Sequence, residues 1–269
     1  MHSLENNVVV LTGAGSGIGR ALALQLAARG ARLALSDVDA AALQETAALL
    51  PAGCEARLYS LDVSRCEAVF AHAEQVRSDF GSVDIVVNNA GVTIIGTVEH
   101  LTIEEIEWQL GINLWGVIYG TKAFLPTMLE QRRGCIVNIS SIFGLIAYPG
   151  QSAYNISKFG VRALTECLWA ELEGTGVRAL SVHPGGIRTA IGKVARMCAA
   201  ANEVERKLAA DSYEVLLTTP PEDCAAAIID GIERGKRRVR VGNRSFTAWW
   251  LPRLFPDSYT AIVRRLTTR

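Results

Sequence analysis

The stretch VVVLTGAGSGIGRALALQLAARG, residues 8–30, decides the fold of this chain. It begins as an apolar run, turns through closely spaced glycines and continues into a helical pattern that ends near residue 29. Glycine lets a backbone turn sharply and lie close to a pyrophosphate, and the free amides at a helix start favour the negative charge of that group. The stretch therefore predicts a strand, a phosphate-binding loop and a helix; a glycine-rich turn without a ligand is the alternative.

The glycine spacing distinguishes between two kinds of dinucleotide-binding loop. Three glycines fit the pattern Gly-x-x-x-Gly-x-Gly, whereas Ile18 stands where the common fingerprint Gly-x-Gly-x-x-Gly requires its third glycine. The less common pattern therefore applies. The loop residues that we expect to contact the cofactor are Gly13, Ser16, Gly17, Ile18 and Gly19.

An acidic residue ends the second apolar run. Asp37 follows Gly13 by 24 residues, where a carboxylate can bind the adenosine ribose hydroxyls and repel a 2′-phosphate. Neither Ser16 nor Val38 supplies the cation that such a phosphate would need. The sequence thus favours NAD over NADP, and the alternative is that Asp37 only caps the helix that begins near Asp39.

Apolar runs and helical patterns alternate along most of the chain. Apolar runs recur at 8–13, 32–37, 56–62, 84–91, 135–141 and 177–185. Helical patterns lie at 17–29, 39–50, 64–79, 102–131 and 151–173. Continuous apolar strands suit a sheet buried on both faces, and the alternation predicts right-handed βαβ units. We therefore expect an α/β fold, a single-domain Rossmann-type doubly wound parallel sheet with helices on both faces.

The later part of the chain is less regular. We expect the core to span about 6–190 and a helical flap to follow at about 190–217. A further helix should begin at Pro220, Pro221 and Glu222, and RVRVG at 238–242 could form an edge strand. Residues from about 243 to 269 form a basic, aromatic extension.

Composition excludes several classes of protein. Basic and acidic residues both number 27, so the net charge gives no general attraction to nucleic acid. No run of about 18 apolar residues offers a membrane span, and the polar start MHSLENN lacks the pattern of a signal peptide. We expect a cytoplasmic protein with reduced thiols and no metal, because its scattered cysteines form no Cys-x-x-Cys pair: Cys54, Cys66, Cys135, Cys167, Cys198 and Cys224.

The stretch SAYNISKFG, residues 152–160, sets a phenol and an ammonium one helical turn apart. Tyrosine ionises near pH ~10, and a nearby cation lowers that value, so Lys158 could make Tyr154 a usable base. Tyr-x-x-x-Lys alone also occurs on many solvated helices. Ser141, at the carboxyl end of a predicted strand, is placed to meet a substrate oxygen. Asn113 could hold a water beside the lysine, or it could be a core amide bonded to a neighbouring backbone.

These motifs together resemble the short-chain dehydrogenase/reductase family. TGAGSGIG, NNAG at 88–91, YNISK and PGGIRT at 184–189 stand in the family's order and spacing, and the match covers roughly residues 6–190. His183 stands where the family often has asparagine. The frequent glycine-rich C-terminal ending of the family is missing, although the resemblance still implies a homodimer or homotetramer.

The resemblance also implies a role for each site residue. Tyr154 would act as acid and base, Lys158 would lower its pKa and bind the nicotinamide ribose, Ser141 would hold the substrate oxygen, and Asn113 would order a proton-relay water. The further residues that it places on the cofactor are Asp62, Val63, Asn89, Ala90, Gly91, Pro184, Gly185, Ile187 and Thr189. A catalytically silent dinucleotide-binding regulator or scaffold of this fold is the alternative.

The segments that build the substrate pocket in this family are mostly apolar here. They are VTIIG at 92–96, IFGLIAYPG at 142–150 and the stretch around Ile191, Val194 and Met197, with no arginine placed for a carboxylate or phosphate. We therefore expect a hydrophobic alcohol or ketone as substrate, while the same residues could equally be core packing.

The extension combines basic and aromatic residues. From Gly231 onward, ten lysines and arginines stand against Glu233 and Asp257, and Phe246, Trp249 and Trp250 follow a helical spacing. Packing of these aromatics on the domain or on a second subunit is the favoured interpretation, because Pro252 and Pro256 interrupt a long amphipathic helix. Contact with anionic membrane lipid is the other.

Overall fold

A computed structural model describes residues 3–189, 195–203, 206 and 217–267. Its centre is a parallel seven-stranded sheet in the order β3-β2-β1-β4-β6-β7-β9. The strands are β1 (Val8–Thr12), β2 (Arg32–Asp37), β3 (Ala56–Ser60), β4 (Ile85–Asn88), β6 (Gly134–Ile139), β7 (Val177–Gly185) and β9 (Arg238–Gly242). The strand order reverses direction between β1 and β4, so a crevice opens at their carboxyl ends.

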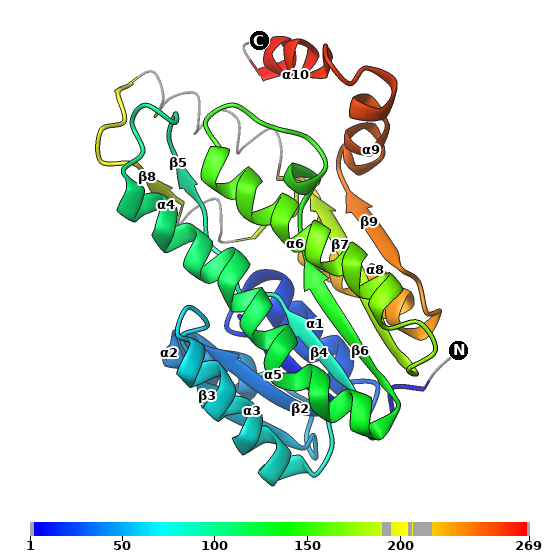
Figure 1. The fold of residues 1–269 in the computed structure, drawn as a ribbon. Helices are drawn as coiled ribbons and strands as arrows, with labels where there is room; N and C mark the ends of the chain where they lie inside the picture. The colour runs from blue at the N-terminus through cyan, green and yellow to red at the C-terminus, as the bar shows by residue number, and fades with distance from the viewer. Residues whose placement is uncertain (1–2, 190–194, 204–205, 207–216, 268–269) are drawn as a thin grey trace.

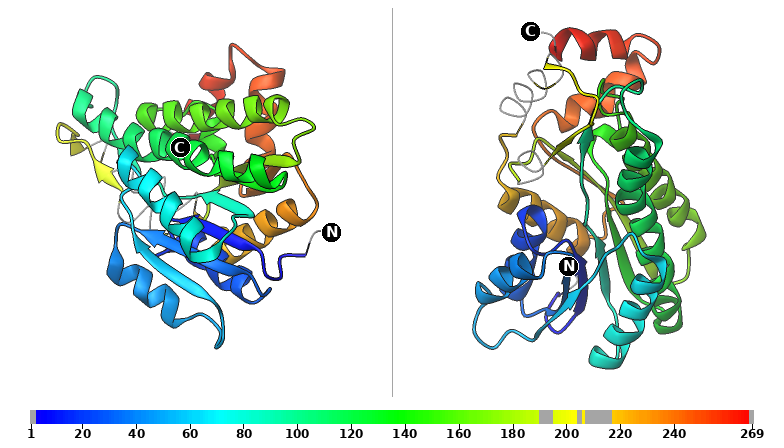
Figure 2. Two further views of the ribbon diagram at one scale, coloured as in Figure 1. Left: turned by 60° about the horizontal axis from the view of Figure 1, so that its bottom comes forward. Right: turned by 90° about the vertical axis from the view of Figure 1, so that its left-hand side faces the viewer.

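Helices cover both faces of the sheet, as Figures 1 and 2 show. Side chains of α1, α2 and α8 share one buried cluster with the strands, and those of α3, α5 and α6 share another. The helices are α1 (Gly17–Ala27), α2 (Ala40–Ala48), α3 (Cys66–Phe80), α4 (Ile103–Leu110), α5 (Gly116–Gln131), α6 (Ser152–Glu171), α8 (Pro221–Glu233), α9 (Ser245–Leu254) and α10 (Tyr259–Thr267). The predicted fold class, a single-domain doubly wound sheet, is confirmed.

The single helix expected over 102–131 was wrong in one respect. It consists of α4, a π-helical turn η1 (Gly111–Trp115) and α5. The wide turn carries Asn113, whose buried amide bonds both the backbone nitrogen and the carbonyl oxygen of Val92 at 2.8 Å. Helical periodicity cannot reveal such a turn, because the change in backbone bonding accompanies a contact with a distant segment.

Beyond β9, the chain continues past the carboxyl end of that strand. Helices α9 and α10 lie together at the end of the molecule away from the N-terminus, as Figures 1 and 2 show. Ala248 and Val263 are buried against Ile142, Leu145 and Ile146, which follow β6. The C-terminal helices therefore buttress the loop that comes directly after Ser141.

No helix within the described ranges is both long enough and apolar enough to cross a bilayer. Two short strands, β5 (Ile94–Ile95) and β8 (Arg196–Met197), pair in parallel apart from the main sheet. This pairing brings the segment after residue 194 beside the segment after β4.

Candidate active site

A cavity of about 830 Å³ runs over the carboxyl ends of β1, β4, β6 and β7. The predicted site residues that line it are Gly13, Ser16, Gly17, Ile18, Asp37, Asp62, Val63, Asn89, Ala90, Gly91, Ser141, Tyr154, Lys158, Pro184, Ile187 and Thr189. The lining does not include Gly19, Asn113 or Gly185, whereas Gly186, which the sequence did not single out, is part of it. The glycine loop and the Tyr-Lys pair thus share one cavity.

The glycine loop needs residues without a side chain. Gly13 and Gly17 have φ angles of 66° and 53°, in the left-handed region that favours glycine. A Cβ on Gly13 would lie 2.8 Å from the Cα of Ala90, and one on Gly19 would overlap the carbonyl oxygen of Gly13. Gly19 therefore allows the loop to pack closely on itself, and it does not line the cavity.

Asn89 braces the loop from the neighbouring strand. Its Nδ2 donates to the carbonyl oxygens of Thr12 and Gly13 at 2.9 and 3.1 Å, and the Thr12 hydroxyl accepts the backbone N–H groups of Asn89 and Ala90. The sequence suggested a contact of Asn89 with the adenosine side but not this bracing, which depends on the pairing of β1 with β4.

The carboxylate of Asp37 is directed at the loop. One oxygen accepts the N–H of Gly15 at 2.8 Å, and the other accepts the N–H of Asp39 at 3.0 Å. The N-cap of α2 is Asp39, whose side chain accepts from Ala41 and Ala42. Asp37 thus lines the cavity. The residue that caps α2 is Asp39 and not Asp37.

The sequence reasoning missed a contact on the outer side of the loop. Arg20 donates to the carbonyl oxygen of Gly15 at 2.6 Å, to the Thr46 hydroxyl at 2.9 Å and to Glu45 at 2.9 Å. The loop is therefore held from α2 as well as from Asn89. In the sequence, only the position of Arg20 directly after the last glycine of the motif pointed to this contact.

Tyr154, Lys158 and Ser141 meet at the other end of the cavity. The ammonium of Lys158 lies 5.6 Å from the centre of the Tyr154 ring, and it donates to the carbonyl oxygen of Ile139 at 2.9 Å. Lys158 is 3% exposed, and burial lowers its pKa to about 8. A cation so close to a phenol favours the phenolate form, which is what a tyrosine base requires.

Ser141 and Phe143 form a further part of the cavity wall. The Ser141 hydroxyl oxygen accepts the N–H of Phe143 at 3.1 Å and caps the short 3-10 helix η2 (Ile142–Gly144). The Phe143 ring meets the Tyr154 ring edge-on at 6.1 Å and stacks on Tyr148 at 4.6 Å. The Ser141 oxygen still has a proton to donate, so it can bind a substrate oxygen.

The amide of Asn113 is fully buried and engaged within the protein. Besides its two bonds to Val92, it donates to the hydroxyl of Ser157 at 3.4 Å. Its Oδ1 and the Lys158 ammonium both flank Gly91, where a Cβ would lie 3.3 and 3.5 Å from them. These contacts hold the chain around Gly91, as expected of a core amide bonded to a neighbouring backbone, and the ordering of a proton-relay water by Asn113 stays a prediction.

His183 contacts the backbone of Ser141, a role that the sequence did not indicate. Its Nδ1 lies 3.2 Å from the carbonyl oxygen of Ser141, and its Nε2 lies 3.0 Å from the hydroxyl of Ser181. A carbonyl oxygen only accepts, so Nδ1 carries the hydrogen and Nε2 accepts from Ser181. The His183 ring is completely buried. In its neutral form, this ring fixes the backbone of Ser141.

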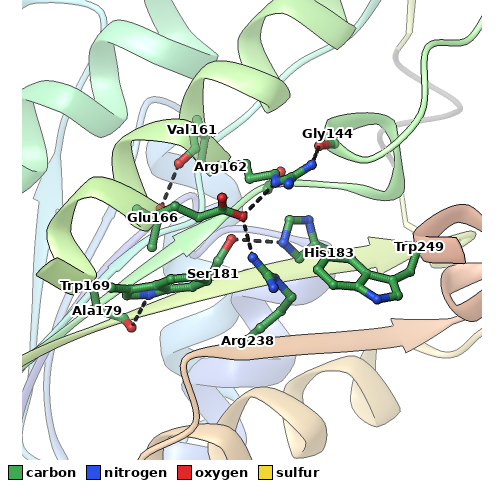
Figure 3. A network of polar contacts seen from close by, with 12 residues as sticks. Gly144, Val161, Arg162, Glu166, Trp169, Ala179, Ser181, His183, Arg238 and Trp249 are labelled. Atoms are coloured by element: carbon green, nitrogen blue, oxygen red, sulfur yellow. Dashed lines mark hydrogen bonds and ion pairs between the residues drawn. The ribbon is translucent and has the colours of Figure 1, made fainter. Parts of the chain in front are cut away.

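Charged groups from α6 and β9 lie near His183, as Figure 3 shows. Glu166 forms ion pairs with Arg162, at 2.7 Å, and with Arg238, which joins α6 to β9. Burial above all, together with the Arg238 and Arg162 guanidinium groups, lowers the pKa of His183 to about 4. Protonation of this ring is therefore costly in the folded protein.

The stability of the fold should fall as the pH drops from 6.5 to 4. His183 and His72, which packs edge-on against Tyr59, both have pKa values lowered to about 4 by burial, whereas an unfolded histidine titrates near 6.5. Between pH 6.5 and 4, these two histidines are protonated in the unfolded chain but mostly neutral in the folded chain. We expect a loss on the order of 3 kcal/mol per histidine at pH 4.

The variant His72→Leu isolates one of these contributions. This substitution should remove about half of the pH dependence that the two buried histidines give to the unfolding free energy. Urea unfolding of both proteins at pH values from 7 to 4.5 measures this effect. An unchanged slope in the variant would contradict a titration of buried His72.

The chain resembles known proteins along most of its length. The sequence pattern of the short chain dehydrogenase family matches residues 7–198. A Mycobacterium tuberculosis protein named as an oxidoreductase, SadH, is 45% identical over 98% of this chain and 96% of its own length.

Solved structures of related proteins superpose well. A short-chain dehydrogenase/reductase from Burkholderia phymatum, in complex with NAD, has a TM-score of 0.86 at 32% identity over 94% of this chain and 95% of its own. An alcohol dehydrogenase from the archaeon Thermococcus sibiricus, complexed with 5-hydroxy-NADP, has a TM-score of 0.72 at 30% identity over 85% and 91%.

Fold and cavity define a dinucleotide-binding α/β protein whose site lies at the strand reversal of its sheet. The chain belongs to the short-chain dehydrogenase/reductase family of oxidoreductases. The family assignment made from the motifs is confirmed.

Proposed function

We propose that this oxidoreductase interconverts a hydrophobic secondary alcohol and its ketone, with Tyr154 as acid and base. The observation that carries the proposal is the convergence of Tyr154, Lys158 and Ser141 at one end of a cavity whose other end is the glycine loop. A nicotinamide dinucleotide, when bound, supplies or accepts the hydride.

The residues present fit such a dinucleotide. The loop at Gly13 and Gly17 is open to a pyrophosphate, and Asp37 lines the cavity beside that loop. The segment from Pro184 to Thr189 lines the same cavity, with Thr189 beside Gly17. Ser141 would hold the substrate oxygen while Tyr154 moves its proton. The buried Lys158 cation would stabilise the phenolate between turnovers.

We further propose NAD as the preferred cofactor. Asp37 supports it, because a carboxylate beside the adenosine ribose repels a 2′-phosphate. The two related structures hold NAD in one case and an NADP derivative in the other, so the preference rests on this carboxylate.

The substrate end of the cavity is mixed rather than purely apolar. Val92, Ile142, Phe143 and Trp108 contribute its apolar lining. An arginine that the sequence did not single out, Arg196, also lines the cavity, with its guanidinium 4.0 Å over the Trp108 ring. The pairing of β5 with β8 places it there, and the sequence does not show this pairing. Of the other expected lining residues, Met197 does not line the cavity, and Ile191 and Val194 lie outside the described residues.

Gln151 gives this pocket a further polar group. It is 6% exposed and lines the cavity three residues before Tyr154, and its Oε1 accepts the Thr93 hydroxyl at 3.1 Å. Its Nε2 makes no hydrogen bond with any residue that the structure describes. A buried amide with a donor left over favours a substrate with a second acceptor oxygen near the ketone.

The variant Gln151→Leu should therefore raise KM about tenfold for hydrophobic ketones with a second acceptor oxygen, because one hydrogen bond is lost. Ketones without that oxygen should show an unchanged kcat/KM. The matched variant Thr93→Val, which removes only the hydroxyl that orients Gln151, should give a smaller effect of the same kind. An equal change for both groups of ketones would contradict the role of Gln151.

A spectroscopic screen tests the proposed function. Hydrophobic ketones of graded size, with NADH or NADPH, are followed by the loss of reduced-nicotinamide absorbance, and the matching alcohols by its gain. We expect turnover of hydrophobic secondary alcohols or ketones with the higher kcat/KM for NAD(H). Cofactor binding without turnover of any compound would instead favour the silent regulator or scaffold.

We also propose a cytoplasmic homodimer or homotetramer that binds no nucleic acid. The support is an exposed apolar face on η1 and α6, where Trp115, Ile156 and Phe159 are 49%, 54% and 36% exposed. Light scattering coupled to size exclusion measures the subunit number, and a monomer would contradict this proposal.

A further inference from the structure

Helix α9 presents an apolar stripe to solvent. Phe246, Trp250 and Leu254 follow at every fourth position and are 67%, 42% and 64% exposed, and the adjoining Phe255 is 48% exposed. The rings of Phe246 and Trp250 lie 6.4 Å apart. We refer to these four residues as the aromatic stripe, and so large a group of exposed apolar side chains indicates a contact surface.

The opposite face of α9 is held firmly on the domain. Ala248 is 2% exposed and packs with Ile142 and Leu145. The Trp249 indole faces guanidinium groups from α6, β9 and α9 itself, among them Arg238 at 4.3 Å and Arg253 at 3.3 Å. Figure 3 shows Trp249 beside the Glu166 and Arg238 network. The aromatic stripe is therefore displayed by an anchored helix and not by a loose end.

Basic residues border the aromatic stripe. Between Arg238 and Arg265 the chain carries a single acid, Asp257, and six arginines, of which Arg238 is paired with Glu166 on the other face of α9. Arg240 lies 5.9 Å from the Phe246 ring, and Arg244 immediately precedes α9; both are exposed. The surface thus combines apolar side chains with an excess of positive charge.

We propose that the aromatic stripe and its bordering arginines dock the protein peripherally on an anionic lipid bilayer. Aromatic side chains partition into the headgroup boundary, and each nearby arginine gains from the negative surface potential. A helix of ten residues is far too short to span a bilayer, so α9 lies in the plane of the interface.

Charge argues against a second copy as the occupant. A two-fold symmetric contact would place the arginines of one subunit against the same arginines of the other. Such a like-charge contact is unfavourable, whereas a bilayer with anionic lipids offers the complementary charge together with an apolar interior.

Docking would also bring the substrate end of the cavity close to the bilayer. The clusters that hold α9 include Phe143, which lines the cavity beside Tyr154. A lipophilic compound dissolved in the membrane would then have a short path to the pocket. The docking itself does not depend on which compound reacts.

Vesicle sedimentation of the full chain tests the docking. The protein should sediment with vesicles of phosphatidylcholine and phosphatidylglycerol, much less with phosphatidylcholine alone, and less as salt rises. The triple variant Phe246→Ser, Trp250→Ser, Leu254→Ser should lower partitioning at least about tenfold, and Arg240→Gln with Arg244→Gln should weaken it and its salt dependence.

The control variant Leu49→Ser with Phe70→Ser removes exposed apolar side chains on α3 and beside α2, and it should partition as the parent does. Thermal unfolding checks each variant, and the two arginine substitutions keep the test decisive where the triple variant is unstable. Absence of sedimentation of the parent with anionic vesicles would overturn the proposal. Full binding by the triple variant, or a change in its subunit number alone, would overturn it as well.

Discussion

Replacing Tyr154 with Phe should remove turnover and leave dinucleotide binding in place. The ring keeps its contact with Phe143, but the hydroxyl that would exchange a proton with the substrate oxygen is gone. General acid and base catalysis typically contributes about 10²–10⁴-fold, so we expect kcat to fall by about 10³-fold or more. Absorbance assays give kcat, and NADH fluorescence gives the cofactor affinity.

The neighbouring variant Tyr148→Phe is the matched control. Tyr148 stacks on Phe143 in the same wall, so its substitution removes a phenol hydroxyl without touching Lys158. It should retain most of the activity. Activity that survives in Tyr154→Phe, or an equal loss in both variants, would show that the proton is moved by another group.

The variant Gly19→Ala should cost both stability and cofactor affinity. Its Cβ would overlap the Gly13 carbonyl oxygen and lie 2.8 Å from the amide of Asn89, so the loop and its brace must move. Overpacking of this kind costs about 1–3 kcal/mol of unfolding free energy. We expect cofactor affinity to fall at least about tenfold, because the amides at the start of α1 shift away from the pyrophosphate.

Gly111→Ala serves as the comparison for stability. Gly111 has a helical φ of −53°, and an added Cβ would meet only the Ser64 side chain, at 3.7 Å. Its unfolding free energy should stay within about 0.5 kcal/mol of the parent. Equal stability of the two variants would contradict the steric role of Gly19.

The sheet and the centre of the site could be predicted from local patterns. Buried parallel strands read as continuous apolar runs, and a glycine loop between a strand and a helix is visible in the sequence. The rule that ligands bind beyond the carboxyl ends of such strands then places Ser141 near Tyr154. These features depend on neighbours along the chain or on one general rule of topology.

Contacts between distant segments could not be predicted. The bond of His183 to the Ser141 carbonyl requires the register of β6 against β7, and the approach of Arg196 to the cavity requires two strands of only two residues each. The amide of Asn113 was recognised as needing partners, but the choice of Val92 depends on a π-helical turn that hydrophobic periodicity does not encode.

The buttress formed by α9 and α10 has a consequence for the order in which the protein matures during synthesis. A domain generally folds as a unit. The glycine loop, Tyr154 and Lys158 all precede residue 190, whereas Ala248 and Val263, which support the wall after Ser141, are made much later. A nascent chain therefore lacks the support for this wall until residue 263 has left the ribosome, so the site should be completed only near the end of synthesis.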